Sequence, residues 1–148
     1  MPHAGLMNEG ALGPVEGPLL RARLHLRGGK RRLREGKVSA AVATLYDALS
    51  AAMEWAVATP AHRRPLRFFT GENPSDDRIV YRVLVRAGIL DGVFDYDAFD
   101  RLLERALADD IRDIDGGRLL VGVESVLLQL GVLPFDEASL PPEDPRTF

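Results

Sequence analysis

Residues 38–58 read VSAAVATLYDALSAAMEWAVA, which is the strongest helical pattern in the chain. The large apolar side chains recur at spacings of three and four residues, the period of one face of an α-helix. Alanine is abundant between them, and alanine both favours helix and lets neighbouring helices pack closely. Pro60 follows, and proline cannot continue a helix. The stretch therefore predicts a buried helix that ends shortly before Pro60.

The segments on either side of this stretch show the same period. We expect four further helices: residues 17–35, a helix from an N-cap at Ser75 to a stop at Gly88, residues 96–114 and residues 118–130. The start of the last segment is rich in valine, and residues 120–123 also fit a strand. For these four residues the sequence favours a helix but leaves the strand open.

Two glycines, Gly28 and Gly29, lie inside the first of these helices. Glycine lowers the stability of a helix by roughly 1 kcal/mol relative to alanine, so a pair of glycines needs a structural reason. We interpret them as either a kink or a place where another backbone comes close.

Five helical segments with short connections predict an all-α, up-and-down, mostly antiparallel helical bundle. The length of 148 residues suits one domain, which we place at residues 15–135. Residues 1–14 contain glycine, proline and asparagine and are expected to be flexible. Residues 136–148 contain three prolines and are expected to form a flexible tail.

The composition excludes several classes of function. Because the chain has no cysteine, it has neither a disulfide framework nor a thiolate metal site. No apolar run approaches the roughly 18 residues of a membrane span. The first residues lack the basic start and apolar stretch of a signal peptide. We therefore expect a soluble cytoplasmic protein without membrane contact, and we predict no cofactor.

The acidic residues near position 110 raise the question of a metal site. Asp109 and Asp113 would share a helix face at i,i+4 spacing, and carboxylates suit Mg²⁺ or Ca²⁺. A solvated acidic helix end explains the same residues, and the twelve-residue calcium loop is missing. The three histidines are also far apart in the sequence. We therefore predict no metal site.

Positive charge is concentrated in one segment. Residues 21–37 contain eight basic residues and one acidic residue, although the whole chain has a net charge of −3. Such a segment can contact the phosphate groups of RNA or of a nucleotide. The candidate contacts on the expected first helix are Arg23, Arg27, Arg31 and Arg34. The basic segment can equally pair with acidic residues of the same chain, inside the monomer or across a homodimer.

Two stretches resemble the HEPN superfamily, over about residues 24–110. The first, LHLRGGKRRLREGKVSAAVATLYDALSAAMEWAV (residues 24–57), has a polar helix ending in Leu-x-x-Gly and an alanine-rich helix with a Tyr-x-Ala centre. The second, RIVYRVLVRAGILDGVFDYDAFDRLLERALADD (residues 78–110), has a helix, a glycine-containing turn and a helix with an Arg-x-x-Ala-Asp motif. The matching residues are Leu33, Gly36, Ala41, Tyr46, Ala48, Ala51, Ala52, Arg105, Ala108 and Asp109.

This resemblance implies a helical bundle that is often dimeric. Some HEPN proteins are metal-independent ribonucleases, in which an arginine is followed after four to six residues by a histidine. Others bind nucleotides or pair with a small nucleotidyltransferase in toxin–antitoxin systems. Here Arg105 is present, but Asp110, Ile111 and Arg112 stand where the histidine is expected. Since RNA cleavage needs a group that transfers protons near neutral pH, ribonuclease activity is not expected.

We therefore predict a HEPN-like binding module for a nucleotide, RNA or a protein partner. The alternatives are a structural or interaction protein that acts as a helical homodimer, and a weak metal-independent ribonuclease. For the ribonuclease, the candidate catalytic residues are Arg105, Asp109 and Asp47, gathered in one pocket. Arg105 and Asp109 can instead form an ordinary i,i+4 ion pair, and Asp47 can lie on the exposed edge of its helix.

Overall fold

The computed structural model describes residues 9–111 and 113–147, and these residues form helices, turns and loops without a β-strand. The α-helices are α1 (Glu9–Arg34), α2 (Val38–Ala58), α3 (Pro60–Arg63), α4 (Asp77–Arg86), α5 (Tyr96–Leu107) and α6 (Gly116–Leu130). Two short 3₁₀ helices follow, η1 (Glu137–Ser139) and η2 (Pro145–Thr147). The all-α fold class is confirmed, and the segment that also fitted a strand belongs to α6.

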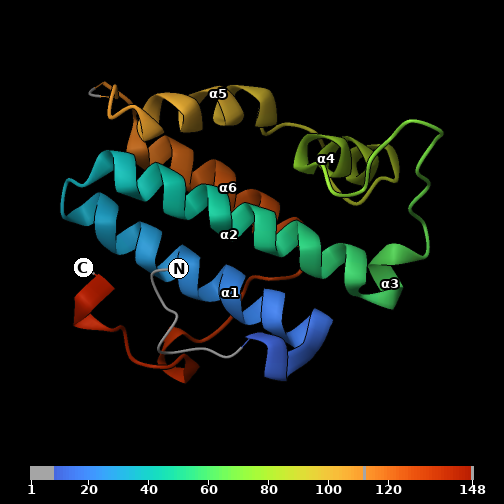
Figure 1. Cartoon of the computed structure of the whole chain (residues 1–148), viewed down its shortest axis with the longest axis horizontal. Helices are drawn as coiled ribbons and strands as arrows, with labels where there is room; N and C mark the ends of the chain where they lie inside the picture. The colour runs from blue at the N-terminus through green and yellow to red at the C-terminus, as the bar shows by residue number, and fades with distance from the viewer. Residues whose placement is uncertain (1–8, 112, 148) are drawn as a thin grey trace.

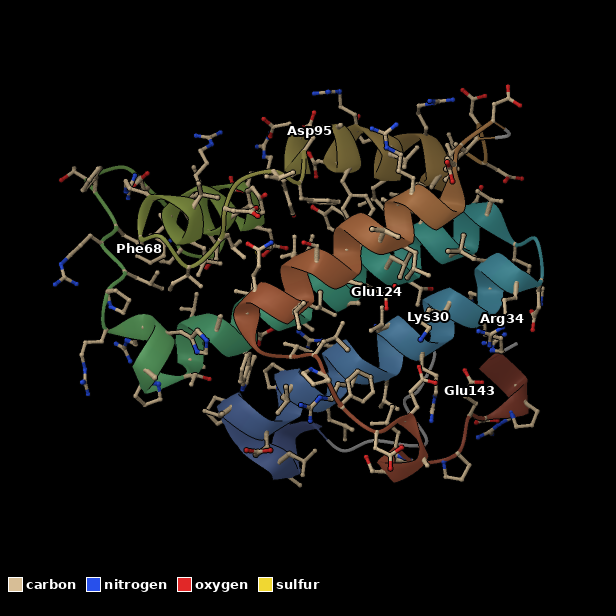
Figure 2. The ribbon with its side chains drawn as sticks, turned by 180° about the vertical axis from the view of Figure 1, so that it is seen from behind. Lys30, Arg34, Phe68, Asp95, Glu124 and Glu143 are labelled. Atoms are coloured by element: carbon tan, nitrogen blue, oxygen red, sulfur yellow. The ribbon has the colours of Figure 1, made fainter. Side chains whose placement is uncertain are left out.

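α2 is the central helix of the bundle. α1 and α5 lie on opposite sides of it in Figure 1, and α6 packs against it on the face that Figure 2 shows. Leu45, Leu49 and Met53 on its apolar face are fully buried. Removing each such side chain from water contributes about 1.5–3 kcal/mol to stability. The helix with the strongest sequence pattern is therefore the one around which the others assemble.

The contact between α1 and α2 is close because Gly29 has no side chain. A Cβ atom at Gly29 would lie 2.6 Å from Cδ2 of Leu45, closer than two carbon atoms can approach. At Gly28 the nearest atoms would be 3.7 Å away, an ordinary contact distance. Of the two interpretations of this glycine pair, the structure shows the close approach, and Gly29 is the residue that requires it.

The kink in α1 lies further toward its N-terminus. Gly13 interrupts the helix with a φ of 86°, a left-handed conformation that glycine adopts without strain. Pro14 follows at a position where a missing amide hydrogen costs little, because a first helical turn has unpaired amides. α1 therefore begins at Glu9 rather than at residue 17. Of the segment predicted to be flexible, residues 9–12 form a short helical piece before the kink at Gly13, and residues 1–8 lie outside the described residues.

α5 is shorter than predicted, because it ends at Leu107 and not at position 114. Asp109 adopts a φ of 53°, and the amides of Asp109 and Asp110 donate to carbonyl oxygens of the last helical turn at 3.0 and 2.8 Å. This is a Schellman ending with aspartate in the left-handed position that glycine usually takes. The prediction that Asp109 and Asp113 share a helix face is therefore wrong.

The segment after α6 returns along α1. Residues 136–147, called the tail below, lie on the side of α1 that faces away from α2 (Figure 1). Asp136 begins η1 by accepting a hydrogen bond from the amide of Ala138 at 2.9 Å. The structure places this segment against α1, where Glu137 pairs with Lys30 and Glu143 pairs with Arg31. The flexibility of the tail stays a prediction.

Candidate binding surfaces

The four arginines predicted as phosphate contacts all lie on α1, but their surroundings differ. Arg23 is half-buried, and its guanidinium donates to the carbonyl oxygen of Val132 at 3.2 and 3.3 Å. The same group lies 5.1 Å from the centre of the Phe135 ring. Arg34, by contrast, is exposed at the last residue of the helix. Arg23 therefore joins α1 to the segment that follows α6.

Arg31 faces the tail and is surrounded by carboxylates. Its Nε donates to Oε1 of Glu143 at 3.1 Å, and its Nη1 donates to both carboxylate oxygens of Glu35 at 3.3 Å. The Nζ of Lys30 donates to Oε1 of Glu137 at 3.0 Å. The pairing of basic and acidic residues inside the monomer, which the sequence left open, is therefore present in the structure.

Arg27 lies near the same carboxylate but does not reach it. Its Nε is 3.9 Å from Oε1 of Glu143, and this nitrogen is buried without a hydrogen-bond partner among the described residues. A buried donor without an acceptor costs about 1–3 kcal/mol. The side chain of Arg31 beside it is only 8% exposed. We call Arg27, Lys30 and Arg31, with the tail carboxylates that they face, the tail site.

The three candidate catalytic residues lie on different parts of the fold: Asp47 on α2, Arg105 on α5 and Asp109 in the turn that ends α5. Arg105 is exposed on α5. Asp47 is exposed on α2, which agrees with the alternative that it lies on the polar edge of its helix. Asp109 accepts a hydrogen bond from Oγ of Ser39 at 2.9 Å, near the start of α2. Ser39 and Asp47 both belong to α2, and about 12 Å of rise along the helix axis separates them. Since α5 ends at Leu107, Arg105 and Asp109 are not an i,i+4 pair on one helix either.

A chain of phenol hydroxyls connects α2 and α5. Tyr96 donates to the hydroxyl of Tyr46 at 2.9 Å, and Tyr46 donates to Oδ1 of Asp100 at 2.8 Å. Tyr81 donates to the carbonyl oxygen of Phe94 at 2.6 Å. Burial raises the pKa of Tyr46 to about 12, and burial also raises the pKa values of Tyr81 and Tyr96. At neutral pH these groups are therefore uncharged hydrogen-bond donors of the core.

We expect that none of the three tyrosines ionises near pH 10, the ordinary pKa of tyrosine, while the chain is folded. A raised pKa means that the folded state holds the phenol proton more tightly than the unfolded state. For Tyr46 this contribution to stability is complete below about pH 10 and is lost as the pH rises through about 12. The near-ultraviolet absorbance of tyrosinate should appear only above pH 10, together with unfolding measured by circular dichroism.

The control for this titration is the chain unfolded in guanidinium chloride, which should ionise near pH 10. Reversible ionisation of any tyrosine near pH 10 in the folded chain would contradict the prediction.

The second surface is a groove between α5 and α6, which both pack on α2. The cavity measures about 590 Å³. Its apolar lining includes Phe94, Phe99, Leu102 and Leu119. A Cβ atom at Gly122 would lie 2.8 Å from the ring of Phe94. Gly122 therefore lets this ring lie against α6 and forms part of the wall of the groove.

The rim of the groove combines exposed valines with acidic side chains. Val93 is 83% exposed and Val121 is 67% exposed. Three carboxylates stand beside them: Asp91, Asp95 and Asp115. Each accepts a hydrogen bond from a backbone amide at 2.9–3.0 Å, which fixes its position at the start of a turn or helix. Figure 2 shows Asp95 at the beginning of α5. The groove is therefore apolar inside and mainly negative at its edge.

The fold and these surfaces define an all-α helical bundle with two candidate binding surfaces, the groove and the tail site. Comparison of the chain with protein-family models, with curated proteins and with solved structures finds no match. Membership of the HEPN superfamily therefore stays a prediction. Across the described ranges, no helix is long and apolar enough to cross a membrane. Within the same ranges, no group of three or more His, Cys, Asp or Glu side chains is placed to hold a metal ion.

Proposed function

We propose that the chain is a helical binding module whose α5–α6 groove takes an amphipathic helix of a partner protein. The observation that carries this proposal is the pair of exposed valines, Val93 and Val121, at the rim of an apolar cavity. Apolar grooves between helices bind the apolar face of a further helix, with anchors at i, i+3, i+4 and i+7. Covering a valine in this way contributes about 1.5 kcal/mol or more.

The charge at the rim indicates what flanks the apolar face of the partner helix. Three carboxylates and one arginine, Arg118, line the groove. A ligand with lysine or arginine beside its apolar residues would complement this charge, whereas an acidic helix would be repelled. We therefore propose a basic amphipathic helix as the ligand.

The sequence predicts a nucleotide, RNA or a protein partner as the ligand. For the α5–α6 groove we propose the protein partner. Support for this choice comes from the groove itself, because its three carboxylates would repel the phosphate groups of a nucleotide or of RNA. We propose binding without ribonuclease activity.

The test uses a defined peptide, because the natural partner is not identified. A fluorescently labelled peptide of leucine and lysine, with leucine at i, i+3, i+4 and i+7, should bind with saturation in an anisotropy titration. Val121→Lys should weaken this binding by at least about tenfold, because it removes an apolar contact and adds a repelling charge. Leu128→Lys is the matched control, since Leu128 lies on the same helix, is 59% exposed and does not line the groove.

Two outcomes would overturn the proposal. One is an equal loss of binding in Val121→Lys and Leu128→Lys. The other is equal binding of a second peptide that carries glutamate in place of lysine. Sedimentation equilibrium tests the homodimer, the alternative from the sequence. A dimer that Val121→Lys dissociates would make a second copy of the chain the occupant of the groove in place of a partner helix.

A further inference from the structure

The tail site concentrates cationic donors on one face of α1. Arg27, Lys30 and Arg31 follow at i, i+3 and i+4, so their side chains are neighbours on the helix surface. Figure 2 shows Glu143 on the tail beside the part of α1 that carries Lys30 and Arg34. A guanidinium removed from water is costly unless an anion compensates its charge. Here Glu35 at the end of α1 supplies one carboxylate to Arg31, and the tail supplies the carboxylates of Glu137 and Glu143.

The carboxylate of Glu143 satisfies this set of donors only in part. It lies 3.1 Å from Nε of Arg31 but 3.9 Å from Nε of Arg27, which has no other acceptor among the described residues. Lys30 pairs with a different carboxylate, that of Glu137. Three glutamates, Glu35 as well as Glu137 and Glu143 of the tail, thus share one cluster of cations, and Nε of Arg27 is still without an acceptor among the described residues.

A phosphate group fits such a cluster better than a carboxylate does. A carboxylate offers two oxygens in one plane, whereas a phosphate monoester offers three oxygens in a tetrahedral arrangement. Two arginines and one lysine on adjacent turns of a helix can each donate to a different oxygen of the same phosphate. The unsatisfied Nε of Arg27 would then gain an acceptor.

We propose that the tail site is a phosphate-binding site, and that Glu143 occupies it as an intramolecular substitute for the phosphate group. A phosphate ligand displaces Glu143 and releases the tail from α1. Because the competing carboxylate belongs to the same chain, its effective concentration is high, and the intact chain binds phosphate weakly. This inference is independent of the proposed function, which concerns the α5–α6 groove.

The experiment removes the negative charge of Glu143 while keeping the size of its side chain. Glu143→Gln should bind a phosphate ligand at least about tenfold more tightly than the unaltered chain. Glu124→Gln is the matched control, because it removes the same charge from α6, and it should bind like the unaltered chain. Adding Arg27→Gln to Glu143→Gln should reverse the gain.

Two probes distinguish the sources of the phosphate. Inorganic triphosphate, titrated by calorimetry, represents a free nucleotide chain, and a labelled single-stranded RNA, titrated by anisotropy, represents a nucleic acid backbone. A gain for the triphosphate alone assigns the site to small phosphate ligands, and a gain for the RNA assigns it to a nucleic acid.

The proposal is overturned if Glu143→Gln and Glu124→Gln bind both probes equally, or if the gain persists after Arg27→Gln. Circular dichroism establishes whether each variant is folded. Should Glu143→Gln fail to fold, the unaltered chain still decides the matter by hydrogen exchange. Amides of residues 136–147 should exchange faster when triphosphate is added to millimolar concentration, and unchanged exchange would refute displacement of the tail.

Discussion

Replacing Phe99 with alanine is expected to lower the free energy of unfolding by about 3–5 kcal/mol. Phe99 is 2% exposed, and its ring centre lies 5.3 Å from that of Tyr46 and 5.5 Å from that of Phe94. Alanine loses the transfer free energy of the ring and leaves a cavity where α2, α5 and the loop before α5 meet. Protein interiors are close-packed, so the neighbouring rings can fill this cavity only in part.

Urea denaturation followed by circular dichroism measures this loss. The matched control is Leu107→Ala on the same helix, because Leu107 is 74% exposed and its truncation should change stability by less than about 0.5 kcal/mol. A loss below about 1 kcal/mol for Phe99→Ala, or equal losses for the two variants, would show that the aromatic cluster is not part of the stable core.

Replacing Gly29 with valine is the second change with a large expected effect, a loss of about 1–3 kcal/mol. The added Cβ would lie 2.6 Å from Cδ2 and 2.8 Å from Cγ of Leu45, which is fully buried. To accommodate it, α1 must move away from α2, or Leu45 must leave its rotamer, and either change loosens the closest pair of helices.

The adjacent glycine provides the control for this prediction. At Gly28 an added Cβ would meet its nearest atoms at 3.7 Å, so Gly28→Ala should raise stability by up to about 1 kcal/mol through helix propensity. The two neighbouring substitutions should therefore shift the midpoint of thermal unfolding in opposite directions. Shifts of the same sign would contradict the assignment of Gly29 alone to the helix contact.

The positions of the helices could largely be predicted from local pattern. The bounds of α2 agree with the predicted helix over residues 38–58, because apolar spacing and Pro60 both mark it. The start of α1 was missed, since Gly13 and Pro14 indicate a break where the chain kinks and continues as helix. The end of α5 was missed because an aspartate, Asp109, takes the left-handed position at which a glycine would have been recognised.

The surfaces were harder to predict, because they depend on contacts between distant segments. Local periodicity contains no information about the contact of Glu143 with Arg31, so the basic helix was predicted correctly and its covering tail was not. The groove left no clear signal in the sequence. Val121 lies outside the apolar stripe of its helix, but single exposed apolar residues are common, and Leu128 on the same helix is exposed without lining the groove.

Because the tail covers basic side chains of α1, the order in which the chain is synthesised decides how long these side chains stay uncovered. Lys30 and its partner Glu137 are 107 residues apart. At about 5–20 residues per second, about 5–20 s pass on the ribosome between the synthesis of one and that of the other. Throughout this interval the basic side chains of α1 exist before the carboxylates of the tail. The growing chain therefore presents to the ribosome and its RNA a basic face that the finished protein covers.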